Sequence, residues 1–356
     1  MSIDNLQTTG SRINFVDLAK GICILLVISL HADIQHIIYF TPKISGYFGS
    51  FRMPLYFILA GLFVGFKSGK KLFIQKKINK LIIPFMFFVF LTNFFGWFVK
   101  ELLPGRELGF FADEFKWVSS FQVAYYEFSH GLNNGPLWFF VCLFIAYIYY
   151  MIIDTIAKGN LLIKGGLCFF AGAIIYCLPT TFNLPFHLDT ALSSIPFIFI
   201  GEYIRKKTKL LVANKYDKFS IPIAIVIFAI MIFTTPNKFH GHQNFFQLYF
   251  NGISGTLAIL LISKQIKSLP IISYMGRYSL IFLGIHHLFI GHIFRIINFF
   301  KLHPFITELI LITIIIGICY LISIVMRKWL PWFCAQKDLI YFIRPEDSEV
   351  KNSVSL

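Results

Sequence analysis

Residues 12–31 read RINFVDLAKGICILLVISLH, with Asp17 and Lys20 toward one end and His31 at the other. The apolar run that starts at Asp17 is long enough to cross a bilayer, which takes about 20 residues in a helix. Asp17 and Lys20 are three positions apart, so they share a helix face and can pair. His31 follows Lys20 by eleven positions, close to three turns and ~16 Å on a similar side of the helix. Ionisable groups inside a span are functional candidates because burying them is costly.

The rest of the chain has the same apolar character. Of its 356 residues, 57% are hydrophobic and 14% are charged, which excludes a soluble globular protein and a disordered one. We therefore predict an all-α, polytopic membrane helical bundle (residues 1–326) of about ten transmembrane helices, followed by a short cytoplasmic tail (327–356) lying partly along the inner surface. The expected spans are about 17–36, 47–66, 81–100, 137–157, 163–180, 189–204, 220–236, 246–263, 271–292 and 305–326.

Basic residues are concentrated in the predicted loops on one side of the membrane. The intervals 67–80 and 205–218 each carry six Lys or Arg residues, and the ten-span arrangement puts both on the face of the N-terminus. The positive-inside rule makes that face cytoplasmic, with both termini there. It also accounts for most of the net charge of +15, so no nucleic-acid partner is expected. All ten histidines fall in the outer half or the outer loops.

Each of the charged candidates has a second interpretation. The pair of Asp17 and Lys20 could be interfacial, with Lys20 reaching the headgroups, and His31 could be a hydrogen-bonded structural histidine. Arg52 opens the second predicted span, where it could bind a carboxylate or a phosphate or could anchor the helix. Pro54 fits the first turn of that helix, because a missing N–H costs nothing there.

Four further motifs give these residues a common interpretation: FRMPLYFILAG (51–61), FIQKKINKLIIP (73–84), GPLWFFVCLF (135–144) and MGRYSLIFLGIHH (275–287). Together with the first helix, they resemble the acyltransferase-3 family of integral membrane proteins, which transfer acyl groups, usually acetyl, to extracytoplasmic carbohydrate. Two departures stand out. Lys77 and Lys80 occupy positions where arginine is common, which keeps the charge but loses the planar fork. Many relatives also carry a C-terminal hydrolase-like domain, which the short tail cannot hold.

The resemblance implies a membrane O-acyltransferase in the bacterial cytoplasmic (inner) membrane. The donor would be acetyl-CoA or another acyl-CoA, and the acceptor a hydroxyl of a surface polysaccharide or a lipid-linked sugar. No metal and no permanently bound cofactor is expected. His31 would be the general base or a transient acyl carrier, while the lysines would attract the CoA phosphates. The residues so implicated are catalytic His31, Lys20 and Asp17, and donor- or substrate-binding Arg52, Lys77, Lys80, Trp138 and His286.

A secondary transporter or flippase for a glycolipid or an oligosaccharide is the alternative. Charges inside the membrane would then line a pathway, and histidines would couple transport to protons. Such transporters often show paired halves with helices broken at matching positions, and we find no such pairing in the sequence. An acyltransferase would add an acyl-sized mass to a surface glycan, whereas a transporter would determine whether the glycan reaches the surface at all.

Overall fold

A computed structural model describes residues 13–33, 42–66, 68–102, 134–177, 184–208, 210–212, 217–234 and 244–342, and these residues form helices and no strands. The main helices are α2 (Asn14–Ala32), α3 (Pro42–Leu62), α4 (Lys70–Lys77), the π-helical turn η1 (Ile78–Ile82), α5 (Ile83–Leu102), α7 (Trp138–Ala157), α8 (Leu161–Ile174), α9 (Leu188–Lys207), α10 (Ser220–Ile232), α11 (Phe245–Ile266), α12 (Pro270–Arg277), α13 (Ser279–Asn298) and α14 (Pro304–Trp329).

The prediction of an all-α membrane bundle is confirmed. Within the described part of the chain, six helical stretches are long and apolar enough to cross a membrane. They are Asn14–Ala32, Lys70–Phe98, Gly135–Ala157, Phe245–Ile266, Ser279–Asn298 and Pro304–Trp329. The count of ten spans and the cytoplasmic location of both termini stay predictions.

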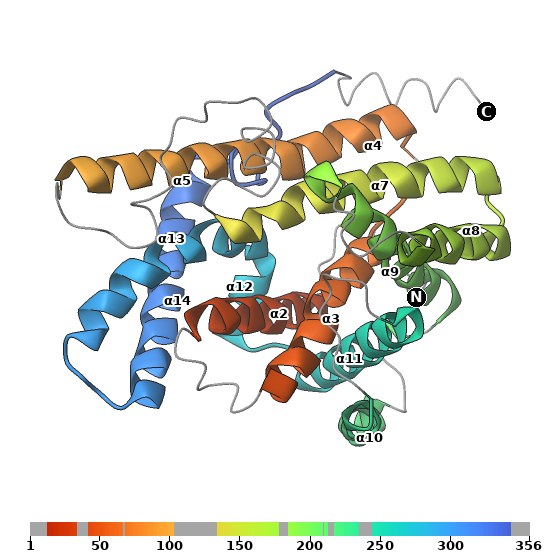
Figure 1. Cartoon of the computed structure of the whole chain (residues 1–356). Coiled ribbons are helices and arrows are strands. Elements are labelled where there is room, and N and C mark those ends of the chain that lie inside the picture. Colours follow the sequence, from red (N-terminus) through yellow and green to blue (C-terminus); the bar gives the residue numbers. More distant parts are fainter. Residues whose placement is uncertain are drawn as a thin grey trace.

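The first helix, α2, lies in the middle of the bundle (Figure 1). It packs against α3, α11, α12, α13 and α14. Its contact with α12 is backbone against backbone, because a Cβ atom added to Gly21 would lie 1.8 Å from the carbonyl oxygen of Ile272. Small residues allow such close approach of helices in membranes. The helix that carries Asp17, Lys20 and His31 is therefore the one that most of the bundle surrounds.

Three details differ from the sequence-based expectations. The basic stretch expected as a loop is helical, with α4, η1 and α5 forming one rod along one side of the molecule (Figure 1). Lysine has a good helix propensity, so the basic residues simply extend the apolar helix. The single span expected over 271–292 is divided at Tyr278 into α12 and α13, and its backbone there (φ −115°, ψ 27°) is not helical.

The third difference concerns the second helix. Because α3 already begins at Pro42, Arg52 does not open the helix and Pro54 lies in its interior. A proline there removes one hydrogen bond of the helix, which neighbouring groups can compensate inside a membrane protein. The neighbouring helix α11 presents Gly252 to Pro54, which leaves room for the proline ring. Tertiary packing therefore tolerates the proline.

Candidate functional site

A cavity of about 440 Å³ opens beside the N-terminal half of α2. Its described lining includes four cationic side chains and no carboxylate; the cations are Lys20, Lys77, Lys80 and Arg277. Lys20 and Lys80 are both close enough to Lys77 for their positive charges to act on it. The structure thus brings together three lysines that come from two separate sequence motifs. Clustered like charges repel each other unless an anion binds between them, so the cavity is suited to a polyanion.

Two of these lysines place their ammonium groups over aromatic rings. The Lys77 ammonium lies 3.8 Å from the centre of the Tyr147 ring, and the Lys20 ammonium lies 5.4 Å from that of Phe63. Cation–π contacts stabilise an ammonium group while leaving its N–H donors able to bond to oxygen. Tyr147 and Phe63 also line the cavity. The lysines are therefore positioned but still able to donate to phosphate oxygens.

Lys80 belongs to the π-helical turn η1. A π-turn adds a residue to the helical repeat and so changes the direction of the side chains that follow it; such turns are frequent at functional sites. Here it sits between Lys77, at the end of α4, and Pro84, near the start of α5. Lys77 reaches the cavity from the residue just before this turn, and Lys80 reaches it from within the turn.

Arg277 is placed by the close contact between α2 and α12. A Cβ atom added to Gly276 would lie 1.7 Å from the carbonyl oxygen of Asp17, so only glycine permits this approach. Arg277 then pairs with Asp17 across the contact, with 3.5 Å between its Nε and the carboxylate Oδ2. Asp17 was expected to pair with Lys20 on its own helix face, and the ion pair with Arg277 was not foreseen. The carboxylate thus helps to hold a cation at the edge of the cavity.

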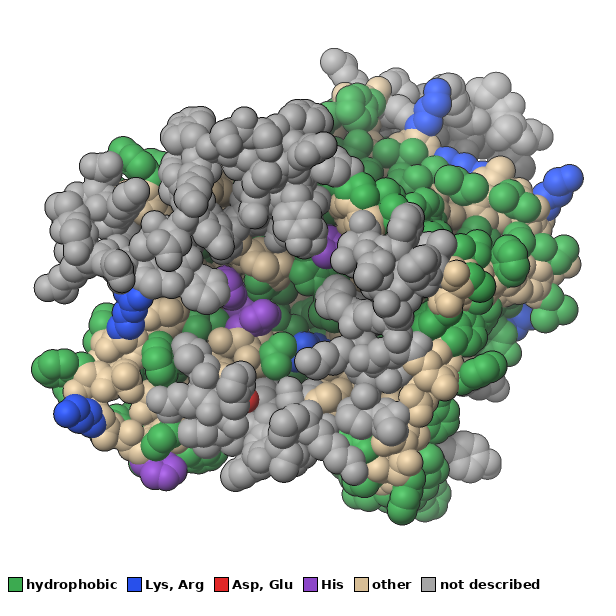
Figure 2. Space-filling view, viewed as in Figure 1, with side chains coloured by type: hydrophobic (Ala, Val, Ile, Leu, Met, Phe, Trp, Pro, Cys, Tyr) green, Lys and Arg blue, Asp and Glu red, His purple; other side chains and the backbone are tan. Residues whose placement is uncertain are grey.

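At the other end of α2, His31 meets two histidines of α13. The centre of its ring lies 5.4 Å from the ring centres of both His286 and His287, which are 6.2 Å from each other. Figure 2 shows histidine side chains gathered in a hollow on one face of the molecule. His286 was implicated only through the family resemblance, and His287 was not implicated. In the described part of the chain, no group of three or more His, Cys, Asp or Glu side chains is arranged so that it could hold a metal ion.

The environment of His286 defines the role of its two nitrogens. The ring is fully buried, and its Nδ1 lies 2.9 Å from the carbonyl oxygen of Phe282. Because a carbonyl oxygen can only accept, this contact puts the proton on Nδ1 and leaves a lone pair on Nε2. That Nε2 is buried and has no hydrogen-bond partner among the described residues. It is therefore available to accept a hydrogen bond from a hydroxyl group that enters the cluster.

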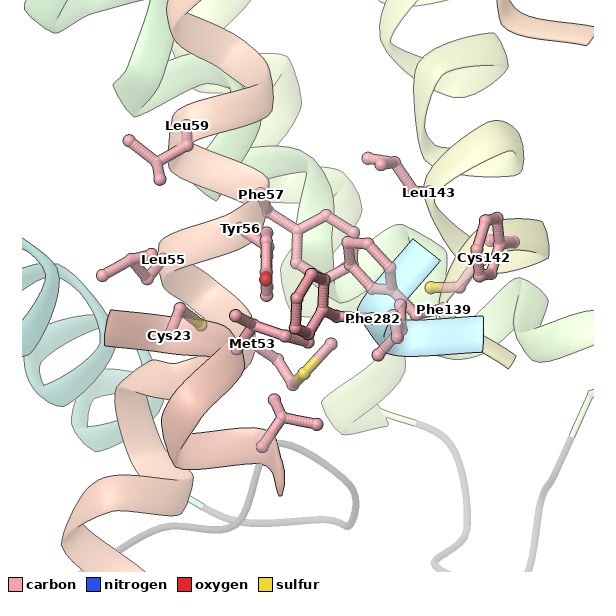
Figure 3. Close-up of a cluster of buried hydrophobic side chains, with 14 of the residues drawn as sticks. Cys23, Met53, Leu55, Tyr56, Phe57, Leu59, Phe139, Cys142, Leu143 and Phe282 are labelled. Atoms are coloured by element: carbon pink, nitrogen blue, oxygen red, sulfur yellow. The ribbon is translucent and has the colours of Figure 1, made fainter. Parts of the chain in front are cut away.

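A cluster of buried side chains, here called the apolar layer, reaches both the cation cavity and the histidines (Figure 3). Tyr56, Phe139 and Leu143 line the cavity from one side of this layer. Phe282, in the same cluster, carries the carbonyl group that contacts His286. Phe139 and Phe282 are almost completely buried. We therefore expect a group that passes from the cations toward the histidines to meet these buried side chains.

The two remaining predicted binding residues do not line the cavity. Trp138 packs against His187, with 5.1 Å between the ring centres. Arg52 lies in the middle of α3, where its charge is close enough to act on His31. Arg52 thus belongs to the neighbourhood of the histidines, whereas Trp138 lies apart from the cavity.

The sequence-based prediction missed a contribution from the segment after α14. Cys334, Ala335 and Gln336 line the cavity, and the backbone of Ala335 accepts a hydrogen bond from Lys80 at 2.9 Å. Cys334 lies outside the membrane-spanning helices, and burial raises the pKa of its thiol. It therefore stays protonated at neutral pH and is a poor candidate for a thiolate acyl carrier. The only sequence signal for this segment was its mixture of aromatic and charged residues.

The profile of one protein family, an acyltransferase domain called acyltransferase-3, matches residues 13–326. No curated protein and no solved structure matches the chain. The matched residues include the four cations of the cavity and the three histidines. The match ends before Cys334, Ala335 and Gln336.

Proposed function

Because the chain belongs to the acyltransferase-3 family, and so is a multi-pass membrane acyltransferase, we propose that it moves an acetyl group from acetyl-CoA to a hydroxyl of a carbohydrate across the membrane. The observation that carries this proposal is that the two ends of α2 lie in chemically different surroundings. Its N-terminal half faces a cavity lined by four cations, and its C-terminal end meets two further histidines. The first suits the phosphates of a nucleotide donor, and the second suits proton transfer from a hydroxyl.

The donor binds with its phosphates among Lys20, Lys77 and Lys80 at the cytoplasmic side. Its thioester arm then extends along α2 toward His31, which lies ~16 Å from Lys20 by the rise of the helix. A slender acyl-thioester arm is compatible with the apolar layer, whereas the phosphates are not, because charged groups are costly to bury without partners. The phosphates therefore stay in the cavity while the acyl group reaches the histidines.

In the transfer step, His31 accepts the proton of the sugar hydroxyl as the oxygen attacks the thioester carbonyl. The new C–O bond forms, the C–S bond breaks, and the CoA thiolate leaves and is protonated by the imidazolium. The buried Nε2 of His286 accepts a hydrogen bond from a second hydroxyl group of the same sugar and so orients the acceptor. General base catalysis by a positioned histidine contributes typically ~10²–10⁴-fold to the rate. In a two-step version, His31 would carry the acetyl group transiently.

The test compares the masses of surface glycans and lipid-linked oligosaccharides from cells that lack the protein and cells complemented with variants. We expect deletion to remove an acetyl-sized increment, and wild type but not His31→Ala to restore it. His303→Ala is the matched control, because His303 is an exposed histidine at the start of α14. Full restoration by His31→Ala, expressed at the wild-type level, would refute its role as base. Loss of entire glycans from the surface would instead support the transporter.

A further inference from the structure

The cation cavity is closed on one side by a segment that follows the last helix, residues 331–342, here called the C-terminal strap. It crosses the rod formed by α4, η1 and α5 (Figure 1). Three of its residues, Cys334, Ala335 and Gln336, line the cavity. All three lie beyond residue 326, where the family match ends. Part of the wall of the proposed donor site is therefore built by a segment outside the family domain.

Buried side chains of the rod hold the strap in place. The Asn79 side chain, which is 1% exposed, makes three hydrogen bonds to the strap backbone: its amide nitrogen donates to the carbonyl of Ile340 at 2.8 Å, and its oxygen accepts from the N–H groups of Leu339 and Ile340 at 2.7 and 2.9 Å. Gln75, 2% exposed, accepts from the N–H of Phe342 at 2.6 Å. Losing such partners would leave buried polar groups unsatisfied, so the contact is specific.

The strap in turn positions a cation. Lys80 donates to the carbonyl of Ala335 at 2.9 Å, and Ala335 has a φ of 62°, which is in the left-handed region. An alanine adopts this conformation only where its surroundings hold it, and such residues often cluster at functional sites. Asn79 and Lys80 are adjacent on the same π-turn. Asn79 therefore holds the strap on the turn, and the next residue, Lys80, is oriented by its hydrogen bond to the strap.

We propose that the strap, anchored by Asn79, is a positioning element of the acyl-donor site that orients Lys80 toward the donor phosphates and excludes water from the cavity. This inference rests on the proposed function, since it assumes that the cavity binds the CoA part of the donor. Asn79 itself does not touch the donor, because its polar atoms are engaged by the strap and by the carbonyl of Gln75. Its role is to hold the wall against which the donor binds.

The test uses the purified full-length protein and measures two quantities: the rise in unfolding temperature caused by CoA, and the KM for acetyl-CoA beside the KM for the acceptor. Asn79→Ala removes the anchor. We expect the donor KM to rise about tenfold, because a loss of affinity of this size is typical when one charged hydrogen-bonding group is no longer held in place. The acceptor KM and kcat should stay near wild type. The stabilisation by CoA should shrink in parallel.

Two matched controls, one deletion of the strap and one graded variant complete the design. Asn93→Ala removes an amide of α5 that bonds back to Val89 within the same helix, and it should behave as wild type. Removal of residues 343–356 leaves the strap intact, whereas removal of 331–356 deletes it and should reproduce Asn79→Ala. Asn79→Asp keeps an acceptor for Leu339 and Ile340 but loses the donor to Ile340, so its donor KM should lie between wild type and Asn79→Ala.

The outcomes separate the two proposals. If CoA stabilises the wild type and Asn79→Ala equally, and their donor KM values agree, the strap has no part in donor binding and the inference is wrong. If Asn79→Ala lowers the unfolding temperature without changing the donor KM, its role is only structural and the inference is also wrong. If CoA fails to stabilise the wild type and no transfer is detected, the proposed function itself fails.

Discussion

Replacement of Gly276 by alanine tests the contact that builds the cation cavity. The added Cβ atom would lie 1.7 Å from the carbonyl oxygen of Asp17 and 2.5 Å from the backbone nitrogen of Gly21. Ordinary van der Waals contact begins at 3.4 Å, so α12 must move away from α2 by ~1.7 Å, the difference between the two distances. Both colliding groups are backbone, so no side-chain rotation can relieve the overlap.

The expected loss of stability follows from two opposing terms. Overpacking in a close-packed interior costs ~1–3 kcal/mol, and a collision between two backbones belongs at the upper end of this range. Alanine recovers up to ~1 kcal/mol of helix propensity relative to glycine. The free energy of unfolding should therefore fall by about 2 kcal/mol. Because Arg277 follows Gly276 directly, its ion pair with Asp17, now 3.5 Å long, would be broken by the same movement.

The measurement combines denaturation of the purified protein with the rate of acetyl transfer. A displacement of about 1 Å in a binding site can reduce the rate ~100-fold, so we expect a loss of activity larger than the loss of stability suggests. Gly317→Ala is the control, because a Cβ atom there meets no heavy atom within 4 Å. It should be as stable as wild type or slightly more stable. Wild-type stability and transfer in Gly276→Ala would show that α2 and α12 are not in backbone contact.

Three further changes probe other parts of the protein. Lys80→Ala should raise the KM for acetyl-CoA and weaken its dependence on ionic strength, measured by kinetics at two salt concentrations, because one phosphate-binding charge is lost; an unchanged KM would exclude Lys80 from the donor site. His286→Phe keeps a buried ring without the acceptor Nε2, so kcat should fall ~10²-fold or more in a folded protein, and normal turnover would remove this histidine from the mechanism. Glu202→Ala removes one of the two carboxylate partners of the buried Lys164, now 3.0 Å away, and leaves Asp154 as the other. Unfolding should become easier by ~1–3 kcal/mol with the donor KM unchanged, and wild-type stability would contradict this role.

The membrane helices could be predicted because their cause is local. A run of apolar residues must form a helix to satisfy its backbone in lipid, whatever its neighbours are. The interior position of Pro54 was not predictable in this way, since it depends on α11 presenting Gly252 to it. The break at Tyr278 likewise accompanies the docking of α12 onto α2 through Gly276. Hydropathy indicates which segments enter the membrane and says little about where a helix bends.

In the candidate site, too, locally determined features could be predicted and those that depend on tertiary contacts could not. The charge of Lys20, Lys77 and Lys80 follows from the sequence, and the structure places the three together; their side of the membrane stays a prediction. The pairing of Asp17 with Arg277 joins residues that are far apart in the sequence and requires a glycine contact that no local pattern reveals. The hydrogen bonds of Asn79 to the strap are of the same kind, because an asparagine at the start of an apolar helix has no local signature of its partner.

The apolar layer between the two ends of α2 also bears on the choice between an enzyme and a transporter. An oligosaccharide moving along this path would have to pass buried rings such as Phe139 and Phe282 while its hydroxyl groups lost their hydrogen bonds to water. An acyl-thioester arm has few such groups to satisfy, so the same rings favour it. In the proposed reaction, the phosphates and the sugar would stay on opposite sides of this layer while the acyl group crosses it. Under the proposed reaction, Lys20 and His31 lie on one helix because that helix holds the two substrates at a fixed separation.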